Sequence, residues 1–229
     1  MVHRSVSRAV CRIFLSASLM WAADFAASQQ APEVADAQAR LSAGVWRSLV
    51  TGGTNVYDFP LTPAGQERYE SFRLDQDPAL RCEPPGMPRA FYHLSPMDFT
   101  FDDDRLTIRY ETMDVVRTVA MGGTPAPADT RATPNGYSLG HWEGSSLIIE
   151  TAYLAAGETT RDGFPKSANM TLREEIRVDE HDDGLHLFAS VTIVDPENFR
   201  EAFTSVNEFV LEPDWELLPF ECNPTEYVQ

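Results

Sequence analysis

The sequence predicts an all-β protein, mainly antiparallel, with one short helix near its N-terminus. From residue 97 onward, short segments alternate apolar and polar residues, which is typical of strands with one buried face. Polar turn residues separate these segments about every dozen residues, as in Asp102-Asp103-Asp104 and Glu212-Pro213-Asp214. The sequence has no internal repeat and no alternation of strands with helices. We therefore expect a sandwich or a barrel rather than a parallel sheet.

Residues 1–28 are expected to be a signal peptide. Three arginines at positions 4, 8 and 12 precede a mostly small and apolar run over 13–27. The Ala-Ala-Ser at 26–28 fits a small-residue cleavage site. The run is shorter than the about 20 apolar residues that a membrane-spanning helix needs. Cleavage would leave a periplasmic or secreted protein without a membrane span, and an uncleaved signal anchor is the alternative.

Cleavage would leave 201 of the 229 residues, enough for one domain with a sizeable core. Residues 29–43 are expected to be a flexible or weakly helical lead-in, and residues 44–229 a single domain. The formal charge would change from −17 to −19, because the segment removed holds three arginines and one aspartate. Such an acidic protein repels phosphates and anionic lipid, so nucleic acid and membrane surfaces are poor candidate partners.

Thr62 and Pro63 predict a helix that runs to about Phe72, because threonine caps helices and proline is favoured in the first turn. A proline-rich connector from Asp77 to Pro88 follows. Strands are expected over 97–101, 106–113, 115–121, 137–142, 146–153, 172–179, 185–194, 203–211 and 215–221.

Two cysteines remain once Cys11 leaves with the signal peptide. Cys82 and Cys222 can pair in an oxidising compartment. The bridge would close a loop of about 140 residues and typically contribute about 2–4 kcal/mol to the free energy of unfolding. Two free buried thiols are the alternative.

Motifs for common catalytic chemistries are absent from the sequence. It has no G-x-S-x-G, no phosphate-binding glycine loop, no dinucleotide fingerprint and no H-E-x-x-H. The histidines at 93, 141, 181 and 186 show no metal-ligand spacing, so neither a metal nor another cofactor is expected. Acid–base chemistry in a pocket is the remaining mode for an enzyme.

Strand alternation selects polar residues that could line a barrel interior. Glu111, Arg117 and Glu150 each share a strand face with apolar or small side chains, and a lumen often takes such a mixed face. They are the candidate catalytic residues, with glutamate as acid or base and arginine as the group that binds an anionic oxygen. An exposed cross-strand ion pair, or a buried pair that fixes strand register, is the alternative. Candidates for ligand contact are His93, Asp98, Arg109, Tyr110, Met113, Tyr137, His141, Trp142 and Glu174.

The stretch Ser138–Thr151, SLGHWEGSSLIIET, resembles a catalytic motif but is interpreted as a hairpin. Its turn falls at Glu143-Gly144-Ser145, where Gly144 would supply the positive φ of a tight turn. Trp142 is expected to be a core or barrel-end plug.

A string of short segments between about residues 57 and 223 forms a recognisable pattern. Its residues are Asp77-Pro78-Ala79-Leu80-Arg81-Cys82, Pro85-Gly86, Pro88-Arg89, Pro96-Met97-Asp98-Phe99, Glu111, Arg117, Ser138-x-Gly140-x-Trp142-Glu143-Gly144 with Leu147 and Thr151, Glu174, Asp195-Pro196, and Trp215-Glu216-Leu217 with Cys222. With these segments together, the chain resembles a family of uncharacterised secreted bacterial proteins. The resemblance implies a lipocalin-like (calycin-type) β-barrel and supports the pairing of Cys82 with Cys222. It implies no established activity.

The chain departs from this family after Met121. The family usually has Asp-Gly-Arg and then His-Pro there, whereas this chain has Gly-Gly-Thr at 122–124 and Ala-Pro at 126–127. The usual histidine before the Ser-x-Gly motif is Tyr137 here. If those polar groups serve a shared chemistry, this protein has lost or changed it.

Three functions are consistent with these patterns. The first is binding of a small hydrophobic or aromatic molecule in the lumen of a periplasmic or secreted barrel. The second is a cofactor-free isomerase, dehydratase, lyase or cyclase that uses acid–base residues in such a barrel. The third is an envelope interaction protein with a filled core and no ligand. The sequence leaves the oligomeric state open.

Overall fold

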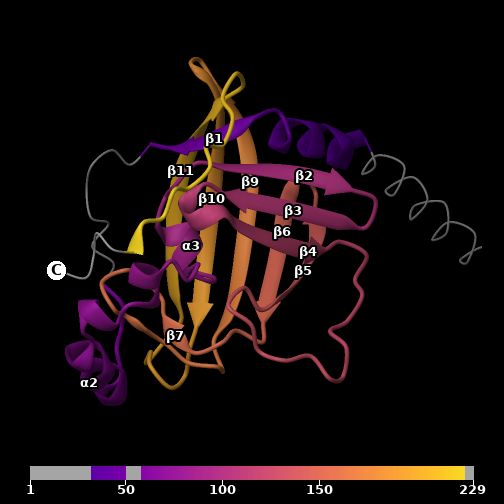
Figure 1. Ribbon diagram of the computed structural model, residues 1–229. Helices are drawn as coiled ribbons and strands as arrows, with labels where there is room; N and C mark the ends of the chain where they lie inside the picture. Colours follow the sequence, from indigo (N-terminus) through magenta and orange to yellow (C-terminus); the bar gives the residue numbers. More distant parts are fainter. Residues whose placement is uncertain (1–31, 50–57, 225–229) are drawn as a thin grey trace, which may run out of the picture.

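Residues 32–49 and 58–224 are described in a computed structural model, and their strands close into a barrel (Figure 1). Nine strands form the barrel wall in the order β1-β11-β10-β9-β6-β5-β4-β3-β2, and β1 pairs with β2 to close it. The barrel strands are β1 (Val45–Ser48), β2 (Met97–Asp102), β3 (Arg105–Tyr110), β4 (Val115–Ala120), β5 (Tyr137–Glu143), β6 (Ser146–Ala152), β9 (Thr171–His181), β10 (Gly184–Val194) and β11 (Phe203–Glu212). The expected all-β barrel is confirmed. The expected signal peptide lies outside the described residues.

Neighbouring barrel strands are antiparallel except for β4 and β5. This parallel pair has Val119 opposite Ser138 and Ala120 opposite Leu139. Parallel neighbours need a crossover connection, which the loop over 121–136 provides. This loop therefore runs along the barrel rather than forming a tight turn.

Two predicted hairpin turns are confirmed. β2 and β3 pair from Asp102 opposite Arg105, with the acidic turn between them. β5 and β6 pair from Glu143 opposite Ser146, and Gly144 in this turn has a φ of 61°. A positive φ is strained for residues with a Cβ, which explains glycine at this position.

The predicted helix near the N-terminus is α2 (Pro63–Ser71). The Thr62 hydroxyl accepts a hydrogen bond from the Gly65 backbone N–H at 3.0 Å, as expected for a threonine cap. Residues 32–41 of the expected lead-in also form a helix, which lies along the top of the barrel in Figure 1. Leu41 of this helix is buried, and its carbonyl accepts a hydrogen bond from Trp46 Nε1 at 2.9 Å. A further short helix, α3 (Arg89–Tyr92), is wholly buried.

The strand expected over 215–221 does not form. β11 ends at Glu212, and residues 213–224, here named the C-terminal strap, run irregularly over the barrel. The closed barrel has no free strand edge to which this segment could add. Side-chain carboxylates accept its N–H groups instead: Glu111 binds Leu218 N at 3.0 Å, and Asp114 binds Phe220 N at 3.1 Å.

Apolar side chains fill the interior of the described barrel. A cavity that admits water would give its lining side chains accessible surface. The apolar inward-facing side chains with at most 1% exposure include Trp46, Leu106, Ile108, Val119, Leu147, Ile149, Leu187, Ala189, Val191, Ile193 and Phe209. Such close packing is typical of a core rather than of a ligand-binding lumen.

Candidate functional site

A buried polar cluster interrupts the apolar interior. Arg117 of β4 donates hydrogen bonds from Nη1 and Nη2 to the two carboxylate oxygens of Glu174 on β9, at 2.9 and 2.5 Å. Its Nε donates to Ser138 Oγ at 3.2 Å, and its Nη2 also donates to Thr151 Oγ1 at 2.6 Å. The cluster thus connects β4, β5, β6 and β9. The sequence predicts a catalytic role for Arg117 and a ligand contact for Glu174, and the fold brings these two side chains together.

The cluster is closed to solvent and fully ion-paired. The side chains of Arg117 and Glu174 are 0% and 2% exposed. Burial opposes the charge of Arg117, but the adjacent Glu174 outweighs this effect and raises the pKa of the guanidinium. Burial also raises the pKa of neighbouring Tyr110 to about 12. This arrangement matches the expected alternative of a buried pair that fixes strand register.

The three candidate catalytic residues do not lie together. Glu150 is exposed on the outer wall, next to inward-facing Ile149 and Thr151. Glu111 follows β3 at the barrel end, where it holds the C-terminal strap. The sequence offered both glutamates as residues that could line the lumen; in the fold Glu150 is exposed, and Glu111 accepts a hydrogen bond from Leu218 N. The apolar face of each strand turns inward because a filled barrel excludes unpaired charges from its interior.

The remaining candidates are spread over the barrel. Asp98 and Arg109 form an ion pair across β2 and β3, with Arg109 largely exposed. Met113 lies in the turn after β3 with a φ of 50°. His93 is exposed after α3.

The candidates in the Ser138–Thr151 hairpin have separate surroundings. His141 is exposed and lies 3.1 Å from Glu143. Trp142 packs on Phe101 with ring centroids 5.9 Å apart, so it closes one end of the core. Tyr137 lies on the outer wall, and its hydroxyl donates to the Thr124 carbonyl at 2.9 Å.

The predicted disulfide is confirmed. Cys82 and Cys222 are bonded across a separation of 140 residues. The bond joins the connector before β2 to the C-terminal strap. Covalent anchoring and the two carboxylate contacts together hold the strap on the barrel.

The first cavity, here named the outer cavity, lies on the outer wall below the 121–136 loop. It has a volume of about 340 Å³, and β5, β6, β9 and β10 contribute to it. Its characteristic residues are Tyr137, Leu139, Glu150, Tyr153, Arg173 and Val194. Glu150 and Arg173 are opposite each other in the β6–β9 register. Two sequence candidates, Tyr137 and Glu150, therefore do share a cavity, but outside the barrel.

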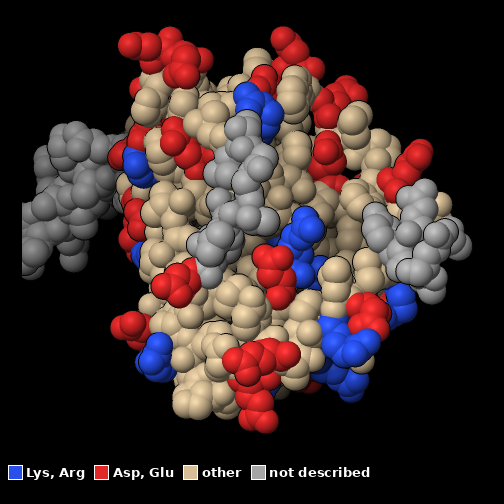
Figure 2. Space-filling model, turned by 90° about the vertical axis from the view of Figure 1, so that its left-hand side faces the viewer, with Lys and Arg blue, Asp and Glu red and all other residues tan. Residues whose placement is uncertain are grey.

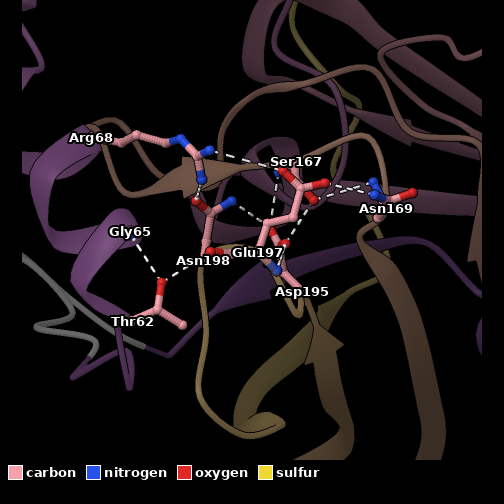
Figure 3. A network of polar contacts seen from close by, with 8 residues as sticks. All are labelled: Thr62, Gly65, Arg68, Ser167, Asn169, Asp195, Glu197 and Asn198. Atoms are coloured by element: carbon pink, nitrogen blue, oxygen red, sulfur yellow. Dashed lines mark hydrogen bonds and ion pairs between the residues drawn. The ribbon is translucent and has the colours of Figure 1, made fainter.

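A second cavity, the end cavity, has a volume of about 510 Å³ and lies between α2, the small hairpin of β7 (Gly157–Glu158) and β8 (Pro165–Lys166), and residues 197–198. A polar network forms one of its walls (Figure 3). Asp195 accepts hydrogen bonds from Ser167 N, Ser167 Oγ and Asn198 Nδ2 at 2.8, 2.6 and 2.8 Å. Asn198 Oδ1 in turn accepts one from Arg68 of α2 at 2.6 Å. This wall is held in place by buried hydrogen bonds rather than by packing alone.

A third cavity, the side cavity, has a volume of about 200 Å³ and shares Glu158 and Lys166 with the end cavity. Neither residue is among the candidates predicted from the sequence patterns. Composition alone distinguishes Lys166, because it is the only lysine in the sequence.

Comparison with protein-family models, with curated proteins and with solved structures gives no match for this chain. The fold thus defines the chain as a closed nine-strand β-barrel protein, which is consistent with the lipocalin-like architecture that the resemblance implies. No helix within residues 32–49 or 58–224 is long and apolar enough to cross a membrane.

Proposed function

We propose that this protein is a periplasmic or secreted barrel that binds a small hydrophobic or aromatic molecule in the outer cavity. The observation that carries the proposal is the exposure of apolar groups around this 340 Å³ space. Tyr153 and Val194 are 45% and 44% exposed there. The volume lies at the lower end of the about 300–1,000 Å³ typical of small-molecule sites.

The polar groups of the outer cavity suggest what the ligand carries. Within the described part of the chain, Glu150 has no hydrogen-bond or ion-pair partner. A ligand that places an amine or another donor against this carboxylate would form a charge-assisted hydrogen bond. An aromatic or aliphatic amine therefore fits better than a neutral hydrocarbon.

Secretion is supported by the N-terminal pattern and by the disulfide, which oxidising compartments permit. Acidic side chains are spread over the face shown in Figure 2, with basic ones between them. Such a surface favours solubility and attracts cationic rather than anionic small molecules.

The other two functions have less support in the geometry. A ligand in the lumen would need space that the buried apolar side chains occupy. The cofactor-free enzyme needs an acid–base pair, whereas Glu111, Arg117 and Glu150 lie apart. An interaction protein without a ligand is the outcome that a negative binding test would favour.

The test is binding of a panel of aromatic and aliphatic amines, measured by calorimetry and native mass spectrometry. Val194→Asn removes apolar surface from the cavity without adding a charge, so we expect it to weaken binding by about tenfold. Val206→Asn is the matched control, because Val206 is 65% exposed on β11 and does not line the outer cavity. Equal affinities for the two variants, or no binding by the unmodified protein, would contradict the proposal.

A further inference from the structure

The only lysine of the chain is buried. The chain has 18 lysine and arginine residues, and the other 17 are arginines. Lys166 is 7% exposed at the end of β8, and its Nζ donates a hydrogen bond to the Met87 carbonyl at 2.9 Å. An arginine guanidinium stays charged at any physiological pH, whereas a lysine amine can lose its proton and become a nucleophile.

Lys166 lies between two cavities that open to solvent. It lines both the end cavity and the side cavity, together with Glu158. The β7–β8 pairing places Gly157 opposite Lys166 and Glu158 opposite Pro165, so Glu158 is one register position from Lys166. A small molecule can therefore approach the amine from either cavity.

Arg89, which lines the side cavity, has a buried donor without a partner in the described part of the chain. It is 5% exposed, and its Nη1 and Nη2 donate to the Asp77 carboxylate at 2.8 and 2.5 Å. Its buried Nε has no hydrogen-bond partner within the described residues. A buried donor without a partner is destabilising, so a ligand group that accepts a hydrogen bond from it is favoured.

The surroundings favour the neutral amine. Burial lowers the pKa of Lys166 from its ordinary 10.5 to about 8; the charge of Glu158 opposes this shift and that of Arg89 adds to it. About half of the amine is therefore unprotonated near pH 8. The other charged residues that line the two cavities are Arg68, Arg73, Glu83 and Glu197.

We propose that Lys166 is the nucleophile of a covalent binding site for small carbonyl compounds that carry a carboxylate, such as 2-oxo acids. The amine nitrogen attacks the carbonyl carbon, and the carbonyl oxygen takes up a proton. The carbinolamine then loses this oxygen as water, which leaves an imine between the ligand and Lys166. Glu158 transfers the protons, and the ligand carboxylate accepts a hydrogen bond from Arg89 Nε.

The dimensions of the side cavity restrict the ligand. Its 200 Å³ is below the about 300–1,000 Å³ of sites for drug-sized molecules. The proposed ligand is therefore a compound of a few carbon atoms. This site is separate from the outer cavity, so the two proposals can fail independently.

The experiment traps the imine in the folded protein. Glyoxylate is added with sodium cyanoborohydride, which reduces an imine to a stable secondary amine, and peptide mass spectrometry then locates the product. We expect modification at Lys166, with a rate that is half-maximal near pH 8. The N-terminal α-amine is the internal reference, and Lys166→Arg should lose the modification at position 166 alone.

Two controls separate the roles of the neighbours. Glu158→Gln removes a charge that raises the pKa of Lys166, so the half-maximal rate should move to lower pH and the maximal rate should fall. Propanal lacks the carboxylate. The ratio of modification at Lys166 to modification at the α-amine should therefore be smaller with propanal than with glyoxylate. Equal ratios would refute the role of Arg89. Two results would refute the proposal that Lys166 is a reactive amine. One is that Lys166 is modified no faster in the folded protein than in the chain unfolded in guanidinium. The other is a half-maximal rate near pH 10.5.

Discussion

Arg117 and Glu174 form a bidentate ion pair inside the barrel, although 57 residues separate them in the sequence. Their strands, β4 and β9, are not neighbours in the barrel wall, and β5 and β6 lie between them. Ser138 and Thr151 from these two strands also accept hydrogen bonds from the guanidinium. A shift in register of any of these four strands would separate the buried charges from their partners. The cluster therefore opposes such a shift.

The first prediction concerns this ion pair. Glu174→Ala leaves Arg117 charged and buried without its partner, so we expect a loss of about 3–5 kcal/mol in the free energy of unfolding. The double variant Arg117→Met, Glu174→Leu should be less destabilised than either single change, because no charge remains buried. Urea denaturation with the disulfide intact measures both quantities. A loss of less than about 1 kcal/mol for Glu174→Ala would show that the pair does not stabilise the barrel.

The second prediction concerns the disulfide. Replacement of both Cys82 and Cys222 by serine should lower the free energy of unfolding by about 2–4 kcal/mol, because the unfolded chain loses a long covalent loop. The native fold should persist, since the barrel core lies elsewhere. Denaturation curves of the variant and of the reduced unmodified protein should coincide, and different midpoints would argue against this explanation.

The third prediction assigns Glu111 a local role. Glu111→Ala removes the acceptor of Leu218 N, so hydrogen exchange at this amide should become faster while global stability changes by less than about 1 kcal/mol. Asp114→Ala should do the same at Phe220. Exchange that stays slow in both variants would show that the disulfide alone holds the strap.

The fourth prediction is a pH dependence at the long β9–β10 hairpin. A hydrogen bond with Glu208 raises the pKa of His186; burial opposes it, and Asp183 adds to it. His186 Nδ1 lies 2.6 Å from Glu208, and its ring stacks on His181 with centroids 4.3 Å apart. The folded pKa is above the unfolded value of about 6.5, so the stabilisation is complete below pH 6.5 and is lost as pH rises through the folded value.

This pH dependence can be isolated by substitution. His186→Gln should reduce the difference in unfolding free energy between pH 6 and pH 8, and Glu208→Gln should reduce it as well. Unfolding at both pH values, measured for the three proteins, gives the comparison. An unchanged difference in His186→Gln would assign the pH dependence to another group.

Local sequence patterns predicted the elements of this fold well. The Thr62-Pro63 cap, the acidic turn before Arg105 and Gly144 in the β5–β6 turn act within a few residues, so they can be identified without the tertiary structure. Alternation of apolar and polar residues likewise located most barrel strands. The prediction of a strand over 215–221 was wrong, because the described barrel is already closed and offers no free strand edge for pairing.

Alternation also defined the two faces of each strand, but not which face turns inward. Glu150 and Thr151 are adjacent, and only closure of the filled barrel places Thr151 inside and Glu150 on the outer wall. The partner of Arg117 and the cavities beside Lys166 likewise depend on segments far apart in the chain. The strands follow from interactions between near neighbours in the sequence. The sites follow from barrel closure, which brings together residues that no local pattern connects.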